Sequence, residues 1–201
     1  MSVTSSQPRG LVPARKAGGD PPAAANMYST GSNRAQIFIG SPVFLDANRK
    51  IQVFQQQTSA NAPAVLGVVV GLFDNNKKPQ THSTEKGIKV STAGFVSVID
   101  DPDCLFEIQC SASVGPVQIG QFAAITTGAG NVGVTANGQS NLMLGETTVV
   151  TAAGHAFQIY SISPRETDGL GGPNNKVLVR ISNHVFRRST RLQGPVEAAD
   201  A

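Results

Sequence analysis

Residues 100–110 constrain the fold of this chain more than any other stretch: they read Asp-Asp-Pro-Asp-Cys-Leu-Phe-Glu-Ile-Gln-Cys. Pro102 fixes its own φ and disfavours helix at Asp101, so the acidic segment predicts a stiff turn. The residues after the turn alternate with a period of two, which predicts a strand. One face of that strand would hold Cys104, Phe106, Ile108 and Cys110, and the other Leu105, Glu107 and Gln109.

The same combination of a polar turn and a short apolar strand recurs from residue 35 onward, and no helical period of useful length is present. Asp46–Arg49 is a turn signal, Ala64–Phe73 resembles a strand covered on both faces, and Val114–Ile119 resembles a further short strand. The 21 glycines and 12 prolines fit a chain with many turns. We therefore expect an all-β fold, a compact β-sandwich or barrel of about ten short strands.

Three regions are expected along the chain. Residues 1–33 are rich in Ser, Pro, Ala and Gly and show no period, which predicts an extended N-terminal arm that is disordered in isolation. This arm either orders on a partner or is a flexible tail without a role, and the sequence leaves both readings open. Residues 34–186 form the all-β body, and residues 187–201 form a short C-terminal tail.

Charge and apolar patterning exclude some classes of function. The net charge is +3 and basic residues concentrate near the two ends, but no aromatic residues alternate with them, so direct nucleic-acid binding is not expected. The longest apolar run, around Ala64–Phe73, is too short to span a bilayer, and no signal peptide is recognised. Cys104 and Cys110 would lie roughly 20 Å apart along one strand, so two reduced thiols are expected.

The sequence carries no complete catalytic or cofactor motif. Gly128–Gly133 matches the dinucleotide pattern GxGxxG, but no helix-forming sequence follows it. The carboxylates of Asp100, Asp101, Asp103 and Glu107 could bind a cation, yet an ordinary Asp-rich turn explains them better. His82, His155 and His184 lie far apart in sequence, and no Gly-x-Ser-x-Gly, Walker or HExxH motif occurs. We expect no enzyme activity, no metal and no cofactor.

Residues near the two ends are the candidates for binding a partner. The tract Asn183–Arg188 carries Phe186 beside arginines; it is either a solvated strand end or a docking tail whose phenylalanine fills a pocket while the arginines meet a partner's carboxylates. The full set of candidate partner-binding residues is Arg9, Arg15, Lys16, Met27, Tyr28, Arg34, Phe186, Arg187, Arg188 and Arg191.

Four segments in a fixed order carry a resemblance to a known family. They are Gly40-Ser-Pro-Val43, Val65-Leu-Gly-Val68, Asp100-Asp-Pro-Asp103 followed by Phe106-Glu-Ile-Gln109, and Val177-Leu-Val-Arg-Ile-Ser-Asn-His184. In these segments, over roughly residues 35–186, the chain resembles capsid decoration (cement) proteins and related structural proteins of tailed-bacteriophage virions. Both tails and the loops at 74–93 and 163–175 lie outside the resemblance.

The resemblance implies a β-rich protein, made in the host cytoplasm, that binds the outside of the capsid and bridges capsomers of the major capsid protein. It also implies a homo-oligomer, a dimer or trimer, on the capsid lattice, with no catalytic residues and no contact with membrane. The alternative is a receptor- or carbohydrate-binding β-sandwich of a phage or cell surface. That alternative is weakened because the chain has no Trp, and only Tyr28 and Tyr160 could supply a tyrosine ring to stack on a sugar. A hydrolase with a dispersed site is the third and least favoured reading.

Overall fold

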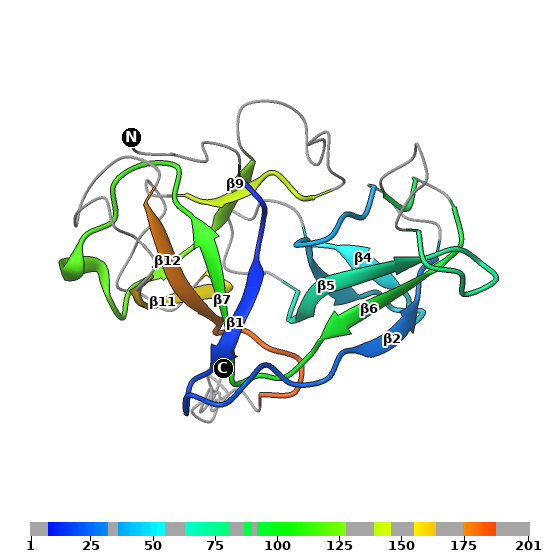
Figure 1. The fold of residues 1–201 in the computed structure, drawn as a ribbon, viewed down its shortest axis with the longest axis horizontal. Helices are drawn as coiled ribbons and strands as arrows, with labels where there is room; N and C mark the ends of the chain where they lie inside the picture. Colours follow the sequence, from blue (N-terminus) through cyan, green and yellow to red (C-terminus); the bar gives the residue numbers. More distant parts are fainter. Residues whose placement is uncertain are drawn as a thin grey trace, which may run out of the picture.

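The computed structural model describes residues 8–31, 36–54, 63–80, 87–89, 92–127, 139–145, 155–163 and 175–187. These residues form twelve β-strands and one short 3₁₀ turn, which confirms the expected all-β class. The strands gather into two lobes that lie side by side (Figure 1). Over the described ranges, the structure has no helix with the length and apolar character needed to cross a membrane.

The first lobe, here called the β7 lobe, is built on a five-stranded antiparallel sheet. Its strand order is β1 (Val12–Lys16), β7 (Cys104–Gln109), β12 (Lys176–Ile181), β11 (Phe157–Ile162) and β8 (Phe122–Ala123). A two-stranded sheet of β9 (Ile125–Thr127) and β10 (Leu142–Leu144) continues from β8 after a single residue. Cys110, just past β7, bridges Leu144 in β10, so the strands curve round towards a closed barrel.

The second lobe, here called the β5 lobe, is a single five-stranded antiparallel sheet. Its order is β2 (Asn26–Ser29), β6 (Phe95–Ile99), β5 (Val65–Phe73), β3 (Pro42–Leu45) and β4 (Ile51–Val53). The two edges of this sheet meet, because Thr30 after β2 bridges Ile51 in β4 and the Lys50 Nζ donates to Ser29 Oγ at 3.0 Å. The β5 lobe is therefore also a small, curved barrel.

The alternation expected for β7 is confirmed. The side chains of Cys104, Phe106, Ile108 and Cys110 all lie in one hydrophobic cluster. The opposite face is covered more fully than a half-buried strand would be, since Leu105 and Gln109 are buried as well. Glu107 on that face is half-buried and accepts a hydrogen bond from Ser163 Oγ at 2.6 Å.

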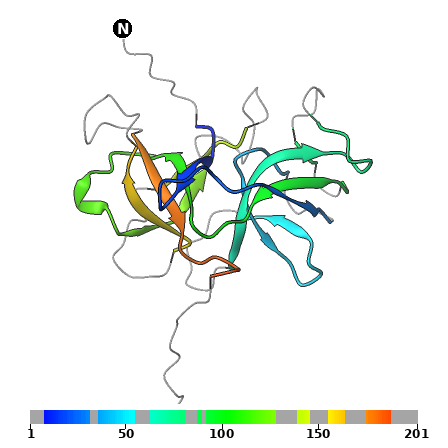
Figure 2. The same ribbon diagram turned by 60° about the horizontal axis from the view of Figure 1, so that its bottom comes forward.

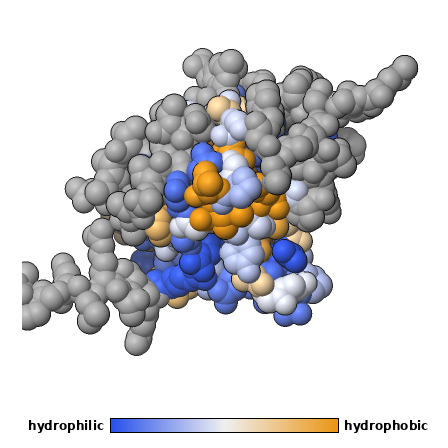
Figure 3. Space-filling view, turned by 90° about the vertical axis from the view of Figure 1, so that its left-hand side faces the viewer, coloured by the Kyte–Doolittle hydropathy of each residue, from blue (hydrophilic) through white to orange (hydrophobic). Residues whose placement is uncertain are grey.

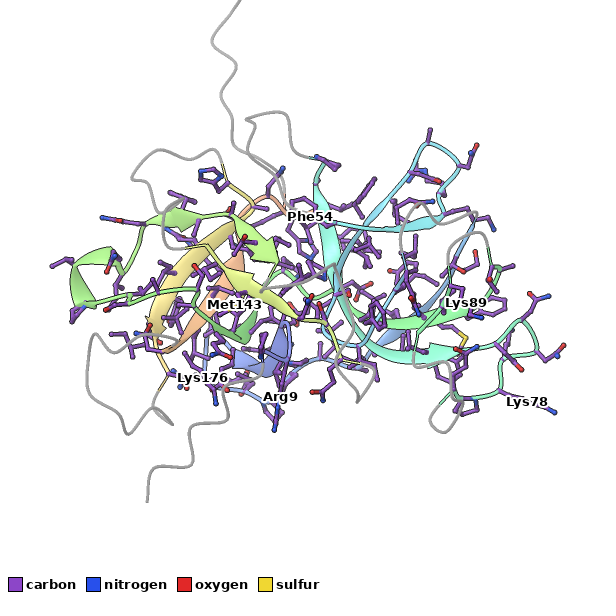
Figure 4. All side chains as sticks on the ribbon, turned by 90° about the horizontal axis from the view of Figure 1, so that it is seen from above. Arg9, Phe54, Lys78, Lys89, Met143 and Lys176 are labelled. Carbon is purple, nitrogen blue, oxygen red and sulfur yellow. The ribbon has the colours of Figure 1, made fainter. Side chains whose placement is uncertain are left out.

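Strand β5 lies between two hydrophobic cores and joins the lobes. Its Leu66 and Val69 pack inside the β5 lobe, whereas Val65 and Val68 pack in the cluster that fills the β7 lobe. Phe54 enters the same cluster and meets Phe157 edge-on, with 6.1 Å between ring centroids. Figure 4 shows Phe54 at the junction of the lobes. The lobes are thus held together by shared apolar packing, which the continuous Val/Leu run of β5 made possible.

The N-terminal segment is extended, but the expectation of an arm separate from the body needs correction. Over the described residues 8–31, β1 pairs with β7 and β2 pairs with β6, so this segment supplies one strand to each lobe. Figure 2 shows the segment running from one lobe to the other across their junction. The segment is fixed because Leu11 is buried in the shared cluster and Tyr28 packs against the core of the β5 lobe.

The strand expected at Val114–Ile119 is wrong. Pro116–Gln118 instead forms the 3₁₀ turn η1, with Gly115 before it. Pro116 supplies no backbone N–H for a sheet ladder, and its fixed φ suits the start of a helical turn. A 3₁₀ turn therefore forms here although the apolar residues alternate as in a strand. Val117 is therefore on the surface. The turn η1, drawn as the green coil in Figure 1, lies at the end of the β7 lobe far from the β5 lobe.

Two glycines allow three segments to cross at close range between the lobes. Gly10 and Gly40 both have positive φ, at 67° and 84°. Leu11 N donates to Gly40 O at 2.9 Å, and Ser140 N donates to Ile39 O at 2.8 Å. A Cβ on Gly40 would lie 2.5 Å from the Arg9 carbonyl oxygen, closer than real Cβ contacts allow.

Replacing Gly40 with alanine should therefore destabilise the protein. Left-handed backbone costs an L-residue about 1–2 kcal/mol, and the contact with the Arg9 carbonyl adds to it, so we expect a loss of about 2 kcal/mol or more in the free energy of unfolding. Gly18→Ala is the control, because a Cβ there meets nothing within 4 Å. Equal denaturation midpoints for the two variants would contradict the close crossing.

Both cysteines are buried free thiols, and burial raises the pKa of Cys104 to about 11. Because thiolate is the reactive form, a maleimide or disulfide reagent at pH 8 should leave both thiols unmodified in the native protein and modify both in urea. One thiol per chain reacting rapidly without denaturant would contradict the packing of β7.

Candidate functional site

Three chain segments pass between the lobes at one place, here called the acidic crossover. They are residues 17–25 between β1 and β2, the turn Asp100–Asp103 between β6 and β7, and residues 182–187 after β12 (Figure 1). The turn closes on itself: Asp101 Oδ1 accepts from Asp103 N at 2.9 Å, and Asp101 O accepts from Cys104 N at 3.1 Å. An aspartate bonding to the backbone two residues later is the usual chemistry of such a turn.

The N-terminal segment binds two of the three carboxylates in this turn. Asp100 accepts from Asn26 Nδ2 at 2.9 and 3.1 Å and from the hydroxyl of Tyr28. Lys16 Nζ lies 2.9 Å from Asp101 Oδ2. Burial, together with the hydrogen bond to the Asp100 carboxylate, raises the pKa of Tyr28 well above its usual value. The Lys16 ammonium lowers the pKa of Asp101, so this ion pair is present at neutral pH.

The C-terminal segment binds the third carboxylate. Arg187 Nη2 lies 2.7 Å from Asp103 Oδ1, and Ala17 N donates to Asp103 O at 2.9 Å. The backbone of the same segment is tied to the β5 lobe, since Val65 N donates to Asn183 O at 2.8 Å and Val185 N donates to Val65 O at 3.0 Å. The segment after β12 is thus fixed at both ends of its crossing.

His184 lies inside this crossing and is 3% exposed. Its Nδ1 accepts from Phe186 N at 3.0 Å, and the two rings lie 5.8 Å apart. Burial is the main cause that lowers the pKa of His184, and the nearby Arg187 cation adds to it. His184 is therefore neutral at pH 7 and acts as a packing and capping residue of the crossing.

The structure places the candidate partner-binding residues in three groups. Lys16, Tyr28 and Arg187 contact carboxylates of the chain's own acidic turn, and the Arg187 guanidinium is paired with Asp103. The expectation that Arg187 meets a partner's carboxylate stays a prediction. Four others are exposed on the folded body, namely Arg9, Arg15, Met27 and Phe186. The remaining three lie outside the described residues: Arg34, Arg188 and Arg191.

The chemistry considered from sequence finds little support in the geometry. The carboxylates of Asp101 and Asp103 face the chain's own cations, and Asp100 faces hydrogen-bond donors, which is the arrangement of a structural clamp. Across the parts of the chain that the structure describes, no three His, Cys, Asp or Glu side chains lie close enough to hold a metal ion. The glycine-rich Gly128–Gly133 and His82 lie outside the described residues.

Exposed apolar side chains are the surface feature that sequence reasoning captured only in part. Phe186 is 58% exposed and Met27 47% exposed, and both were among the candidates. Val117 at 84% and Ile119 at 44% were missed, because their apolar alternation resembled a buried strand. The Gly115-Pro116 pair was the signal that could have revealed a turn there.

Comparison of the chain with protein-family models, with curated proteins and with solved structures gave no match.

The ion pair at Asp101 makes stability depend on pH in a defined direction. Because the pKa of Asp101 is lowered in the folded state, its contribution is present above the unfolded pKa, near 4, and is lost as the pH falls through the folded pKa. Asp101→Asn keeps an acceptor for Asp103 N but removes the charge, so it should lower the urea midpoint at pH 7, with the difference shrinking below about pH 4.

Asp20→Asn is the control, since Asp20 is an exposed carboxylate of the same crossing segment. A gap between Asp101→Asn and the wild type that stays constant from pH 7 to pH 2 would show that the charge of Asp101 does not stabilise the crossover.

Proposed function

We propose that this chain is a structural protein of a tailed-bacteriophage virion, a capsid decoration (cement) protein. In this role it binds the outer surface of the head and bridges neighbouring capsomers of the major capsid protein. The resemblance in four ordered segments over residues 35–186 is the starting point for the proposal. The all-β architecture is compatible with it.

One observation carries the proposal: exposed apolar side chains lie at three separate places on a body whose two lobes are packed together. Val117 and Ile119 lie at the outer end of the β7 lobe, Met27 lies on β2 of the β5 lobe, and Phe186 lies at the acidic crossover. Exposed apolar side chains in distinct places are the kind of anchors that protein partners cover. A body whose lobes share one core can hold two neighbouring subunits at a fixed distance.

The fold changes which part of the chain is proposed to do the binding. Lys16, Tyr28 and Arg187 are engaged within the chain, so the folded body is the binding element. Residues 1–7 of the expected arm and residues 188–201 of the expected tail lie outside the described residues, and their binding to a partner stays a prediction. Many copies on a repeating lattice need only modest affinity each when they are joined as dimers or trimers, because linked sites gain from effective concentration.

The alternative, a carbohydrate- or receptor-binding module, is less well supported. Sugar-binding surfaces use exposed aromatic rings for stacking, and the chain has no Trp. The Tyr28 hydroxyl is held by Asp100, and Tyr160 is only 38% exposed. We therefore keep the virion role as the proposed function.

The proposal predicts that the purified full chain binds bare capsids assembled from the major capsid protein of the same phage. Co-sedimentation should saturate at a fixed number of copies per capsomer, and the bound capsids should withstand heating to a higher temperature before they open. Capsids that already carry the protein are the control and should take up no more. Absence of saturable binding, or binding without any gain in heat resistance, would contradict a cementing role.

A further inference from the structure

The most exposed apolar side chain of the described structure, Val117, lies within a long stretch of sequence that carries no charge. From Ile108 to Gly145 the sequence contains no Asp, Glu, Lys, Arg or His, although charged residues make up 14% of the whole chain. This run includes η1 and the strands β8, β9 and β10 of the β7 lobe. The nearby cation is Arg180, whose Nε donates to Gln158 Oε1 at 2.6 Å.

The turn around η1, residues 115–121, is here called the apolar knuckle, and it is well ordered by its own hydrogen bonds. Gln118 N donates to Gly115 O at 3.1 Å, and the Gln118 side chain accepts from Gly115 N in return. Ile119 N donates to Pro116 O at 3.2 Å, and Gln121 Nε2 donates to Val117 O at 3.3 Å. Pro116 restricts the backbone further.

The apolar knuckle is also fixed to strand β11. Gly120 N donates to Ile159 O at 2.8 Å, Ile159 N donates to Gln121 O at 2.9 Å, and Gln158 Nε2 donates to Gly120 O at 2.6 Å. The positive φ of Gly120, 87°, turns the chain back towards the lobe after the exposed residues. Val117 and Ile119 are thus held out from the lobe on a rigid support.

The side chains presented by the apolar knuckle are mostly in contact with solvent. Val117 is 84% exposed and Ile119 is 44% exposed. Figure 3, which faces the end of the β7 lobe where η1 lies, shows an apolar patch in the middle of the surface with hydrophilic residues below it. A rigid turn that presents two branched apolar side chains loses little conformational entropy when a partner covers it.

We infer that the apolar knuckle is the anchor that enters an uncharged, apolar pocket on the capsid surface. The inference rests on the proposed function and names the contact that carries it. The partner chemistry follows from the composition of the knuckle: residues 115–121 carry no charged side chain, and the nearby Arg180 is bonded to Gln158. An anionic membrane or nucleic acid needs a cluster of cations, so neither matches this surface. An apolar protein pocket matches this surface. Attachment through the knuckle should therefore depend weakly on salt concentration.

The test compares three full-length proteins by co-sedimentation with bare capsids of the same phage at 50 and 500 mM salt. Val117→Ser combined with Ile119→Ser should raise the apparent Kd about tenfold to a hundredfold, because each apolar side chain contributes about one factor of ten when buried. Val12→Ser is the matched control: Val12 is 39% exposed on the edge strand β1 of the same lobe, away from the apolar knuckle, and should leave the Kd within about twofold of wild type. Urea midpoints equal to wild type would show that both variants remain folded.

The other possible results separate failure of the inference from failure of the proposed function. A double variant that binds as tightly as wild type overturns the inference alone, as does a wild-type affinity that falls steeply with salt. Sedimentation equilibrium that shows wild-type oligomers and a monomeric double variant would make a second copy of the chain the occupant of the knuckle, against the inference. A wild-type chain that binds no capsid overturns the proposed function and the inference with it.

Discussion

Apolar packing between the two lobes is the interaction on which the rest of the structure depends. Val65, Val68 and Phe54 leave the β5 lobe and enter the cluster that fills the β7 lobe, where Phe54 meets Phe157. The hydrogen bonds at the glycine crossing and the ion pairs of the acidic crossover lie at this junction and fix its geometry. Exposed ion pairs contribute little to stability by themselves, whereas each large apolar side chain buried contributes roughly 1.5–3 kcal/mol. The packing therefore holds the lobes together, and the polar contacts fix the position of one lobe relative to the other.

The acidic turn makes more contacts than the ordinary Asp-rich turn that its sequence predicts. Asp100, Asp101 and Asp103 each accept a donor from a segment of the chain that is distant in sequence. The turn thereby ties the N-terminal segment and the residues after β12 to the point where β6 passes into β7. Lys16, Tyr28 and Arg187 thus close the body, while apolar side chains such as Val117 remain exposed.

Local patterns predicted much of the fold correctly, because alternation and turn chemistry act over a few residues. The faces of β7 followed from its period of two, and the turn at Asp46 formed as expected, with Asp46 Oδ1 accepting from Asn48 N and Lys50 N at 2.9 Å. The strands β1 and β2 could not be predicted, since Val12–Lys16 and Asn26–Ser29 have little β character alone and are recruited by the edges of β7 and β6. The candidate site was recovered only in part for the same reason: the pairing of Arg187 with Asp103 joins residues far apart in sequence.

We expect the two lobes to form one cooperative unit, which keeps the exposed apolar side chains at fixed distances from one another. Differential scanning calorimetry of the full chain measures this cooperativity, because lobes that share a core must unfold together. A single transition whose calorimetric and van't Hoff enthalpies agree is expected. Two separate transitions, each with its own midpoint, would contradict it.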